Sequence, residues 1–301
     1  MMANPLTLER LRALPLPMPE EGGKEQRGTA LVLGGTTEVP GAAFLAGVAA
    51  LRAGAGRLRI ATVRSVAISM ALAVPEARVV GLAETEGGEI DPAEAETRVL
   101  ALAERCQAVL IGPGLSAGTA TDALSVSLLS GRPAASFVLD AGAIPGLADH
   151  AAAVRACGGR AVITPHAGEM ARLLKIERNA VETDPLAAAL RAADLLECVV
   201  IMKGAESWIV NPAGERWLYS GGGVGLATSG SGDALSGILA GLLARGADAM
   251  TAALWGVHLH GEAGRRLADR VGPIGFLARE IAAEVPAILR DVVRAATRAR
   301  A

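Results

Sequence analysis

Short apolar runs rich in β-branched residues recur along the chain, and each is followed by a stretch with helical spacing. The runs that predict strands occupy residues 30–33, 58–63, 108–111, 137–139, 161–163 and 199–202. The first helices are expected at residues 40–53, 65–73 and 119–129, with others after Asp140 and from Gly168. Strands that alternate with helices and are apolar on both faces predict a mostly parallel sheet between two helical layers, a three-layer αβα sandwich.

The pattern changes after Lys203. Two short runs, residues 207–210 and 216–219, flank a turn that contains Pro and Gly, and together they predict an antiparallel hairpin at a sheet edge. From Ser231 onward the spacing is almost entirely helical. The helices expected there include residues 234–244, 249–269 and 281–299.

Composition excludes several classes of protein. Of the 301 residues, 51% are apolar and 20% charged, which is enough for a core and excludes disorder. A formal net charge of −2 and an aromatic content of 2% provide neither a basic surface nor stacking platforms, so we expect no nucleic-acid partner. No linker or shift of composition divides the chain. We therefore expect a single domain over residues 1–301, with residues 1–27 as an N-terminal arm.

Three features bear on the compartment. No uncharged apolar run approaches the ~18 residues that a membrane helix needs. Glu9 and Arg10 interrupt the N-terminus, which therefore lacks a signal-peptide core. Cys106, Cys157 and Cys198 are odd in number and far apart, which disfavours a disulfide framework and a thiolate metal site. We expect a cytoplasmic protein with no membrane partner.

The strongest chemical signal is a glycine-rich segment that enters an apolar helix. Eight of the 37 glycines lie between Gly221 and Gly241. Residues 230–232 thus present bare backbone N–H groups at a helix N-terminus, an arrangement that suits a phosphate. Asp233 follows in the first turn. It is either a base that takes a proton from a hydroxyl attacking phosphorus, or a cap that offsets the helix dipole.

Two further segments lie where predicted strands end. Residues 112–117 formally fit the dinucleotide pattern G-x-G-x-x-A, but the acidic residue expected ~20 positions later is missing. This segment is a substrate-lining turn, a structural turn or a dinucleotide site. His166 follows Thr164 and Pro165 at another strand end, where it either bonds a ligand or stabilises the turn. Metal ligation by His166 is disfavoured because no Cys or Asp stands at ligand spacing.

The remaining candidates are single side chains. Lys203 begins a segment, residues 203–207, that either contacts a nucleotide or only forms the hairpin turn. Asp140 is a magnesium-side carboxylate or a cap. His258 and His260 lie in a helical stretch, where a core or helix-surface position is favoured.

Taken together, these segments resemble the ADP/ATP-dependent NAD(P)H-hydrate dehydratases of the ribokinase-like superfamily. The resemblance covers roughly residues 28–290. Its elements are residues 34–35, 40–43, 52–56, 111–115, 139–141, 164–174, 202–205 and 225–233. Thr-Pro-His-x-Gly-Glu and Gly-x-Ala-Thr-x-Gly-x-Gly-Asp together are specific to this family, whereas Gly-x-Gly-Asp alone marks only the superfamily.

The resemblance implies a ribokinase-like fold and a repair reaction. Such enzymes restore NADH or NADPH by removing water from the hydrated nicotinamide ring at the expense of ADP or ATP, with Mg²⁺ on the nucleotide. By similarity, Asp233 would deprotonate the ring hydroxyl. Contacts with the nucleotide are implied for Lys203, Gly204, Ala205, Glu206, Ser207, Gly230, Ser231 and Gly232. Contacts with the hydrate are implied for Ala42, Ala43, Gly114, His166 and Asp233. The resemblance assigns no side chain to a metal ion.

The chain departs from the family pattern at four positions. Gly142 stands where an Asp is common and Gly223 where an Asn is common, while Ser116 and Ala167 replace Gly and Pro. Two alternatives therefore stay open: a kinase for a sugar or vitamin-precursor hydroxyl, and a nucleotide-binding protein without turnover. We also expect a homo-oligomer, small-molecule ligands only, and no fused epimerase domain.

Overall fold

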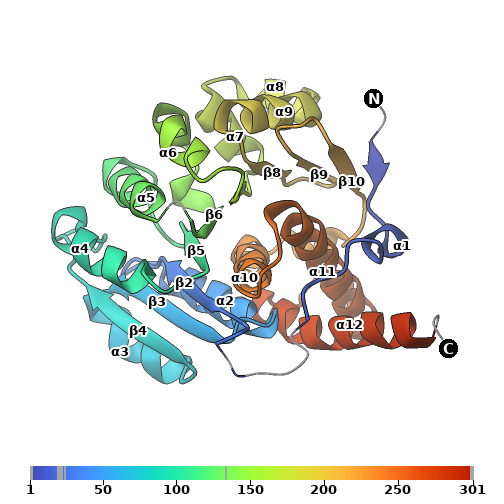
Figure 1. The fold of residues 1–301 in the computed structure, drawn as a ribbon, viewed down its shortest axis with the longest axis horizontal. Helices are drawn as coiled ribbons and strands as arrows, with labels where there is room; N and C mark the ends of the chain where they lie inside the picture. The colour runs from blue at the N-terminus through green and yellow to red at the C-terminus, as the bar shows by residue number, and fades with distance from the viewer. Residues whose placement is uncertain (1–2, 19–22, 24, 133, 299–301) are drawn as a thin grey trace.

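Ten strands form one sheet within the described part of the chain, which comprises residues 3–18, 23, 25–132 and 134–298 of a computed structural model (Figure 1). Their order is β1-β10-β9-β8-β7-β6-β5-β2-β3-β4. The strands are β1 (Asn4–Pro5), β2 (Thr29–Leu33), β3 (Arg57–Val63), β4 (Ala77–Leu82), β5 (Ala108–Ile111), β6 (Ser136–Leu139), β7 (Ala161–Ile163), β8 (Val199–Met202), β9 (Ser207–Val210) and β10 (Arg216–Tyr219). Strands β2 to β8 pair in parallel, whereas β9 is antiparallel to β8 and to β10.

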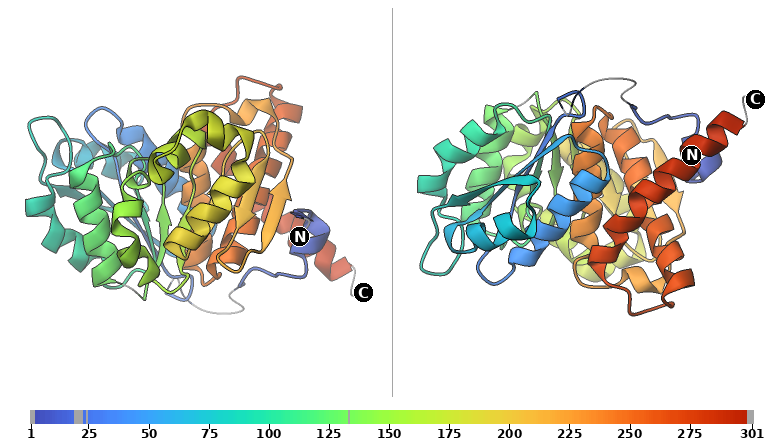
Figure 2. Two further views of the ribbon diagram at one scale, coloured as in Figure 1. Left: turned by 90° about the horizontal axis from the view of Figure 1, so that it is seen from above. Right: turned by 90° about the horizontal axis from the view of Figure 1, so that it is seen from below.

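Helices cover the two faces of this sheet (Figure 2). The N-terminal and middle helices are α1 (Leu8–Leu11), α2 (Pro40–Arg52), α3 (Arg64–Ala73), α4 (Pro92–Ala103), α5 (Thr119–Gly131), α6 (Ala151–Arg155) and α7 (Ala167–Leu174). The later ones are α8 (Arg178–Thr183), α9 (Pro185–Leu196), α10 (Ser231–Ala244), α11 (Ala249–Arg270) and α12 (Ala278–Arg298). One core lies under α2, α10, α11 and α12, and a second lies under α4, α5, α7 and α9. Among the described residues, no helix is long and apolar enough to cross a membrane.

The α/β layers and the antiparallel edge hairpin confirm the predicted fold class. Each of the six apolar runs is a strand, and the predicted hairpin is β9 and β10. Strands β1 and β4 and helices α1, α4, α8 and α9 were not predicted. Strand β4 lies at the sheet edge, where its partly exposed residues give no continuous apolar run. Helix α12 covers the helix predicted at 281–299, of which Ala299 lies outside the described residues.

The predicted N-terminal arm is described over residues 3–18, 23 and 25–27, and its residues 1–2, 19–22 and 24 lie outside the described part. Strand β1 pairs in parallel with β10. The indole Nε1 of Trp255 donates to Leu14 O at 2.7 Å, and the Arg245 guanidinium donates to Pro17 O. These bonds fasten the arm to α11 and to the end of α10.

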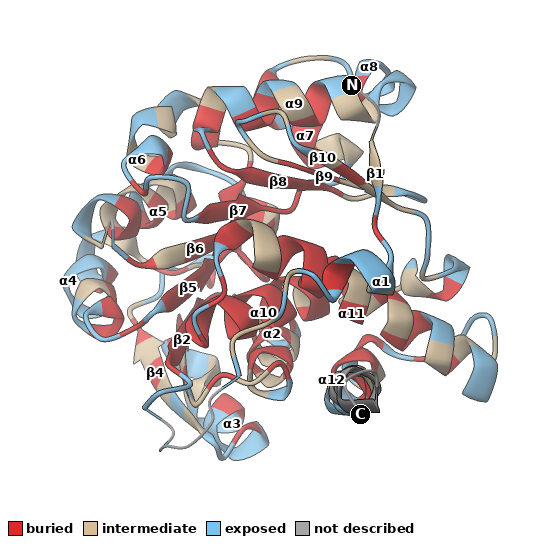
Figure 3. Ribbon diagram, turned by 45° about the vertical axis from the view of Figure 1, so that its right-hand side comes forward, coloured by how far each residue is buried: buried red, intermediate tan, exposed pale blue. Residues whose placement is uncertain are grey.

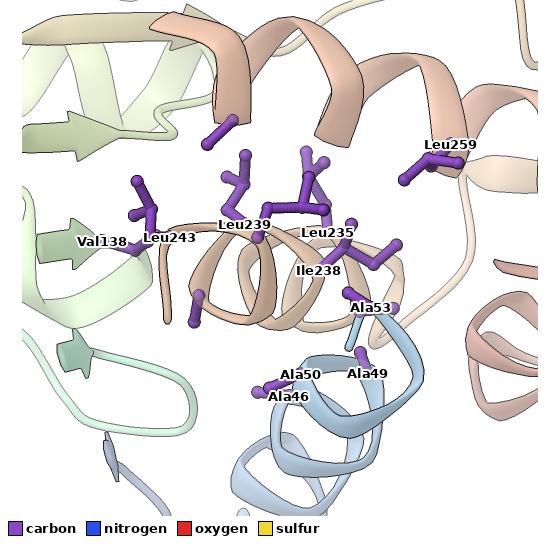
Figure 4. Close-up of a cluster of buried hydrophobic side chains, with 14 of the residues drawn as sticks. Ala46, Ala49, Ala50, Ala53, Val138, Leu235, Ile238, Leu239, Leu243 and Leu259 are labelled. Carbon is purple, nitrogen blue, oxygen red and sulfur yellow. The ribbon is translucent and has the colours of Figure 1, made fainter. Parts of the chain in front are cut away.

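Helix α10 packs unusually close to α2; α10 is almost wholly buried, and α2 buries the alanine-rich face that it turns to α10 (Figures 3 and 4). A Cβ at Gly237 would lie 2.2 Å from Ala46 O, and a Cβ at Gly241 would lie 2.3 Å from Ala50 O. Since real Cβ contacts are never this short, the approach of the two backbones requires glycine at both positions. The N-termini of α2 and α10 are thereby held at the same end of the sheet, where the parallel strands also end.

Candidate active site

The predicted chemical segments meet at the carboxyl ends of the parallel strands. The turn at 112–114 follows β5, Asp140 follows β6, His166 follows β7 and Lys203 follows β8. An isolated parallel bridge pairs His166 with Lys203. This is the edge at which α/β sheets bind their ligands, because helix N-termini and loops converge there.

The glycine-rich segment forms the predicted loop at the start of α10. Gly230 is the N-cap, with a φ of 85° that favours glycine, and it makes no side-chain cap bond. A Cβ there would lie 2.5 Å from Leu45 Cδ1. Ser231 begins the helix and Asp233 lies in its first turn. The backbone N–H of Ser231 donates to Thr228 O at 3.2 Å. The N–H groups of Gly230 and Gly232 are therefore the backbone donors of this loop that suit an anion at the helix N-terminus.

Lys203 faces three carboxylates at this end of the sheet. Its Nζ lies 3.1 Å from Asp140 Oδ1 and 3.8 Å from Glu169 Oε2. Burial alone would lower the pKa of Lys203, but the charges of Asp140, Glu169 and Asp233 outweigh it and raise that pKa. A Cβ on Gly232 would lie 3.4 Å from Lys203 Nζ, so the ammonium is next to the α10 loop. The structure thus supplies a permanent cation beside the candidate phosphate site.

Asp140 is held in place by two donors. Thr164 Oγ1 donates to Asp140 Oδ1 at 2.6 Å, and the Lys203 ammonium is the second donor. Asp140 stands at the N-terminal end of a short 3₁₀ turn, Ala141–Ala143, but makes no side-chain cap bond there. Its carboxylate therefore accepts hydrogen bonds within the Lys203 cluster, formed by Lys203, Asp140, Glu169 and Asp233, rather than capping the turn.

The pKa of Asp233 suits a general base that works near neutral pH. Burial, followed by repulsion from Asp140, raises the pKa of Asp233 from its ordinary 3.8 to about 7, although attraction to Lys203 opposes the change. A carboxylate with a pKa near the working pH combines sufficient basicity with a large ionised fraction. The cap alternative is weaker, because Gly230 occupies the N-cap position.

His166 caps helix α7. Its Nδ1 accepts from the backbone N–H of Gly168 at 3.0 Å, while Glu169 Oε2 accepts from the backbone N–H of His166 at 2.9 Å. This reciprocal pair is a capping box with histidine in place of serine. Because Nδ1 accepts, the proton of the neutral ring is on Nε2, and more than half of the side chain is exposed. The turn-stabilising interpretation describes this geometry. The Nε2 of His166 lies 3.4 Å from Glu169 Oε1, so a ligand at this nitrogen would compete with that carboxylate.

A pocket of about 300 Å³ opens beside Asp233. It is lined by Thr36, Glu38, Val39, Ala42, Gly87, Glu89, Gly114, Leu115, Ser116, Ala141 and Asp233. Three of the predicted hydrate contacts thus meet in one pocket. Ala43 and His166 do not line it, and Ala43 is fully buried behind Gly34 and Gly35.

A larger hollow of about 750 Å³ lies at the amino ends of the strands. It adjoins Gln107, Ser136, Arg160 and Val199, each at or just before the start of a strand. It contains none of the predicted site residues, so the smaller pocket is the candidate active site.

The other predicted nucleotide contacts follow Lys203. Gly204, Ala205 and Glu206 form the exposed turn between β8 and β9, and Ser207 begins β9 opposite Tyr219. Glu206 Oε1 accepts from Ser220 Oγ at 2.7 Å. The turn lies beside the Lys203 cluster, and its exposed backbone is open to a ligand.

Sequence reasoning missed three parts of the site. Glu89 lines the pocket from the loop after β4, where its Oε1 accepts from Ser116 Oγ at 2.5 Å. Glu169 faces Lys203 from α7. His260 of α11 brings its Nε2 to 2.9 Å from Ser231 Oγ. Glu169 had a signal, since it ends the Thr-Pro-His-x-Gly-Glu motif, but nothing in the sequence pairs His260 with Ser231.

Comparisons with known proteins show the family of the chain. The family model described as NAD(P)H-hydrate dehydratase matches residues 30–287. An ADP-dependent (S)-NAD(P)H-hydrate dehydratase of Xanthomonas campestris pv. campestris is 51% identical, covering 96% of this chain and 97% of its own. The Bacillus subtilis ADP/ATP-dependent NAD(P)H-hydrate dehydratase, co-crystallised with ATP/Mg²⁺, superposes with a TM-score of 0.82 at 28% identity, over 97% and 99% of the two chains. A ribokinase-like superfamily protein from Enterococcus faecalis V583 gives 0.81 at 25% identity, over 96% of both chains. The ribokinase-like fold prediction is confirmed.

Proposed function

The chain belongs to the NAD(P)H-hydrate dehydratase family, and on that premise we propose that it restores NADH or NADPH from their hydrates with ADP or ATP as co-substrate. The observation that carries the proposal is the position of Asp233. It stands at the N-terminus of α10, in the wall of the small pocket, and its carboxyl has a pKa of about 7. The names of the relatives support ADP as the donor, and one relative is named for both nucleotides.

The proposed chemistry proceeds through a phosphate ester of the ring. Asp233 takes the proton of the ring hydroxyl, whose oxygen forms a bond to the terminal phosphorus as the bridging P–O bond of the nucleotide breaks. The bonding electrons leave with the nucleoside phosphate. The ring C–O bond then breaks, inorganic phosphate departs, and loss of a proton from the neighbouring carbon restores the double bond. Phosphate leaves far more readily than hydroxide, so the nucleotide supplies the driving force for losing water.

The rest of the site stabilises the charge that moves in this reaction. In our proposal the N–H groups of Gly230 and Gly232 receive the transferring phosphoryl group, since the Ser231 N–H already donates to Thr228 O, and the Lys203 ammonium neutralises that group from the side. Asp140 keeps Lys203 in place and also keeps the pKa of Asp233 high. The turn at 204–207 lies where the remainder of the nucleotide would contact the protein.

Magnesium is proposed only as a companion of the nucleotide. Nowhere in the described ranges do three His, Cys, Asp or Glu side chains converge to hold a metal ion. Asp140 and Glu169 face Lys203 instead. This donor set does not fit a protein-held metal, whereas Mg²⁺ is commonly bound through nucleotide phosphates and water. The base and the fixed cation of the site are the protein's own side chains.

On the substrate side, the hydrated ring would enter the pocket between Ala42 and Gly114 to reach Asp233. His166 would meet the substrate outside this pocket through its half-exposed ring, whose Nε2 lies 3.4 Å from Glu169 Oε1. Ala43 would shape the pocket indirectly, because its methyl group packs against the Gly34–Gly35 turn: a Cβ added at either glycine would lie within 3.5 Å of it. The cytoplasmic location and the homo-oligomer stay predictions.

The kinase alternative has lost its main motivation. A Cβ at Gly142 would lie 2.2 Å from Leu115 O, so the close approach of the turn at 112–116 itself requires glycine. Gly223 has φ 79° and ψ 167°, a conformation that is almost confined to glycine. Both departures from the family pattern therefore have local backbone reasons and need no change of substrate.

The direct test is recovery of the reduced-nicotinamide absorbance from NADH hydrate with magnesium and ADP or ATP. We expect recovery with the wild-type protein and a loss of about 10²–10⁴-fold in kcat for Asp233→Asn. The matched control is Asp248→Asn, since Asp248 is the N-cap of α11 and Asn also caps well. No recovery with either nucleotide contradicts the proposal, and a stable phosphorylated alcohol from a substrate panel favours the kinase.

A further inference from the structure

His260 makes two contacts with a single residue of the α10 loop. Its Nε2 lies 2.9 Å from Ser231 Oγ and 3.1 Å from Ser231 O. Burial lowers the pKa of His260 to about 4, opposed by the Ser231 backbone bond and assisted by the charge of Lys203. At neutral pH the ring is therefore uncharged and carries one N–H.

The two contacts decide which nitrogen carries that proton. A carbonyl oxygen only accepts, so the nitrogen next to Ser231 O must be the donor, and the neutral ring is in the Nε2–H form. The same N–H reaches Ser231 Oγ, whose hydroxyl then accepts from it. A hydroxyl that accepts from the histidine keeps its own hydrogen for another acceptor.

We infer that His260 is a positioning residue for phosphoryl transfer, whose Nε2–H fixes the Ser231 hydroxyl so that its hydrogen is donated to the phosphate bound at residues 230–232. Ser231 is buried, and it stands between Gly230 and Gly232 at the first turn of α10. Without His260, the Ser231 hydroxyl loses the donor that fixes the direction of its hydrogen. The inference rests on the proposed nucleotide-dependent function.

His258 offers a matched control on the same helix. Its ring packs edge-on against Tyr219 and Trp255, with ring centroids 6.3 and 6.1 Å away. Burial lowers its pKa, as it does for His260. Substitution of His258 therefore removes a partly buried helix histidine without touching the Ser231 contact.

Affinity for ADP tests the role. His260→Leu should weaken ADP binding about three- to tenfold, the value of one lost hydrogen bond. His260→Gln should restore binding to within about twofold, because the side-chain amide keeps an N–H donor, and His258→Leu should leave it unchanged. Ser231→Ala should cause a loss of similar size. The double variant Ser231→Ala/His260→Leu should lose nothing more, because both changes remove the same hydroxyl donor.

The ring proton is tested separately, on the ligand-free protein. Long-range ¹⁵N–¹H NMR should show the Nε2–H form for the histidine whose signals vanish in His260→Gln. An Nδ1–H form overturns the inference, as do unchanged ADP affinity in His260→Leu or additive losses in the double variant. If wild-type protein binds no ADP, the proposed function and the role of His260 fail together. If it binds ADP and the His260 results fail, only the inference is lost.

Discussion

Asp140→Asn and Lys203→Met should move the acid limb of the pH profile in opposite directions. Asp233 has a pKa of about 7, raised by burial and then by Asp140, and lowered by Lys203. A base must be ionised, so wild-type kcat/KM for the hydrate should fall as pH falls through 7. About nine tenths of the Asp233 carboxyl is ionised at pH 8 and about one tenth at pH 6.

Neutralising Asp140 removes a repulsion and should lower the pKa of Asp233 by about one unit. At pH 6 the ionised fraction would then rise from about a tenth to about a half, a fivefold gain relative to the plateau. Removing the Lys203 ammonium should move the limb to higher pH. The plateau itself should fall in both variants, so each profile is normalised before its midpoint is compared.

The assay is the initial rate of NADH recovery at saturating ADP from pH 5 to 9, with Asp248→Asn as the unshifted control. The terminal phosphate of ADP titrates near pH 6, but this contribution is common to all variants. The reasoning is refuted if the wild-type limb lies below pH 5, or if the limb stays in place in both variants.

Three other predictions concern stability and substrate binding. Asp233→Asn should raise the free energy of unfolding above pH 7, because the folded chain then no longer contains a carboxylate that burial destabilises. The full pKa difference between the folded and unfolded chain corresponds to about 4 kcal/mol, which is the upper limit of the gain. The gain should fade as pH drops below 7 and vanish near 4, which denaturant titrations at several pH values can check. Gly237→Ala should cost about 1–3 kcal/mol through the clash with Ala46 O, seen as a lower Tm, whereas Gly246→Ala, which meets nothing within 4 Å but has positive φ, should cost about 1 kcal/mol. Ser116→Gly should release Glu89 and raise KM for the hydrate more than it lowers kcat; an unchanged KM would show that their hydrogen bond does not shape the pocket.

The fold was readable from sequence wherever burial is two-sided. The runs at 108–111 and 199–202 lie in the middle of the sheet, where every residue is covered and the apolar pattern has no gaps. Strand β4 is an edge strand of six residues, of which only two are buried and the rest are intermediate or exposed, so its signal is weak. The pattern of apolar residues predicts a strand where the strand is fully buried, and it misses a strand that is only partly buried.

The site was readable where it is built from backbone. The α10 loop and the turn at 112–114 need glycine for their conformations, and glycine is visible in a sequence. The contacts of His260 with Ser231 and of Glu89 with Ser116 join residues 29 and 27 positions apart on different elements. Such contacts depend on how α11 and the loop after β4 are placed in space, which no local pattern encodes.

The glycine–alanine contact between α10 and α2 has a consequence for motion. Side chains normally lie between two helices and let them slide by changing rotamer. At Gly237 and Gly241 the α2 backbone meets α10 directly, so there is no rotamer to change. The two helices should move as one body that carries Asp233 on one helix and Ala42 on the other. If Asp233 and Ala42 have the roles proposed above, the separation between base and ring is set before either ligand arrives, and adaptation to different substrates is left to the surrounding loops.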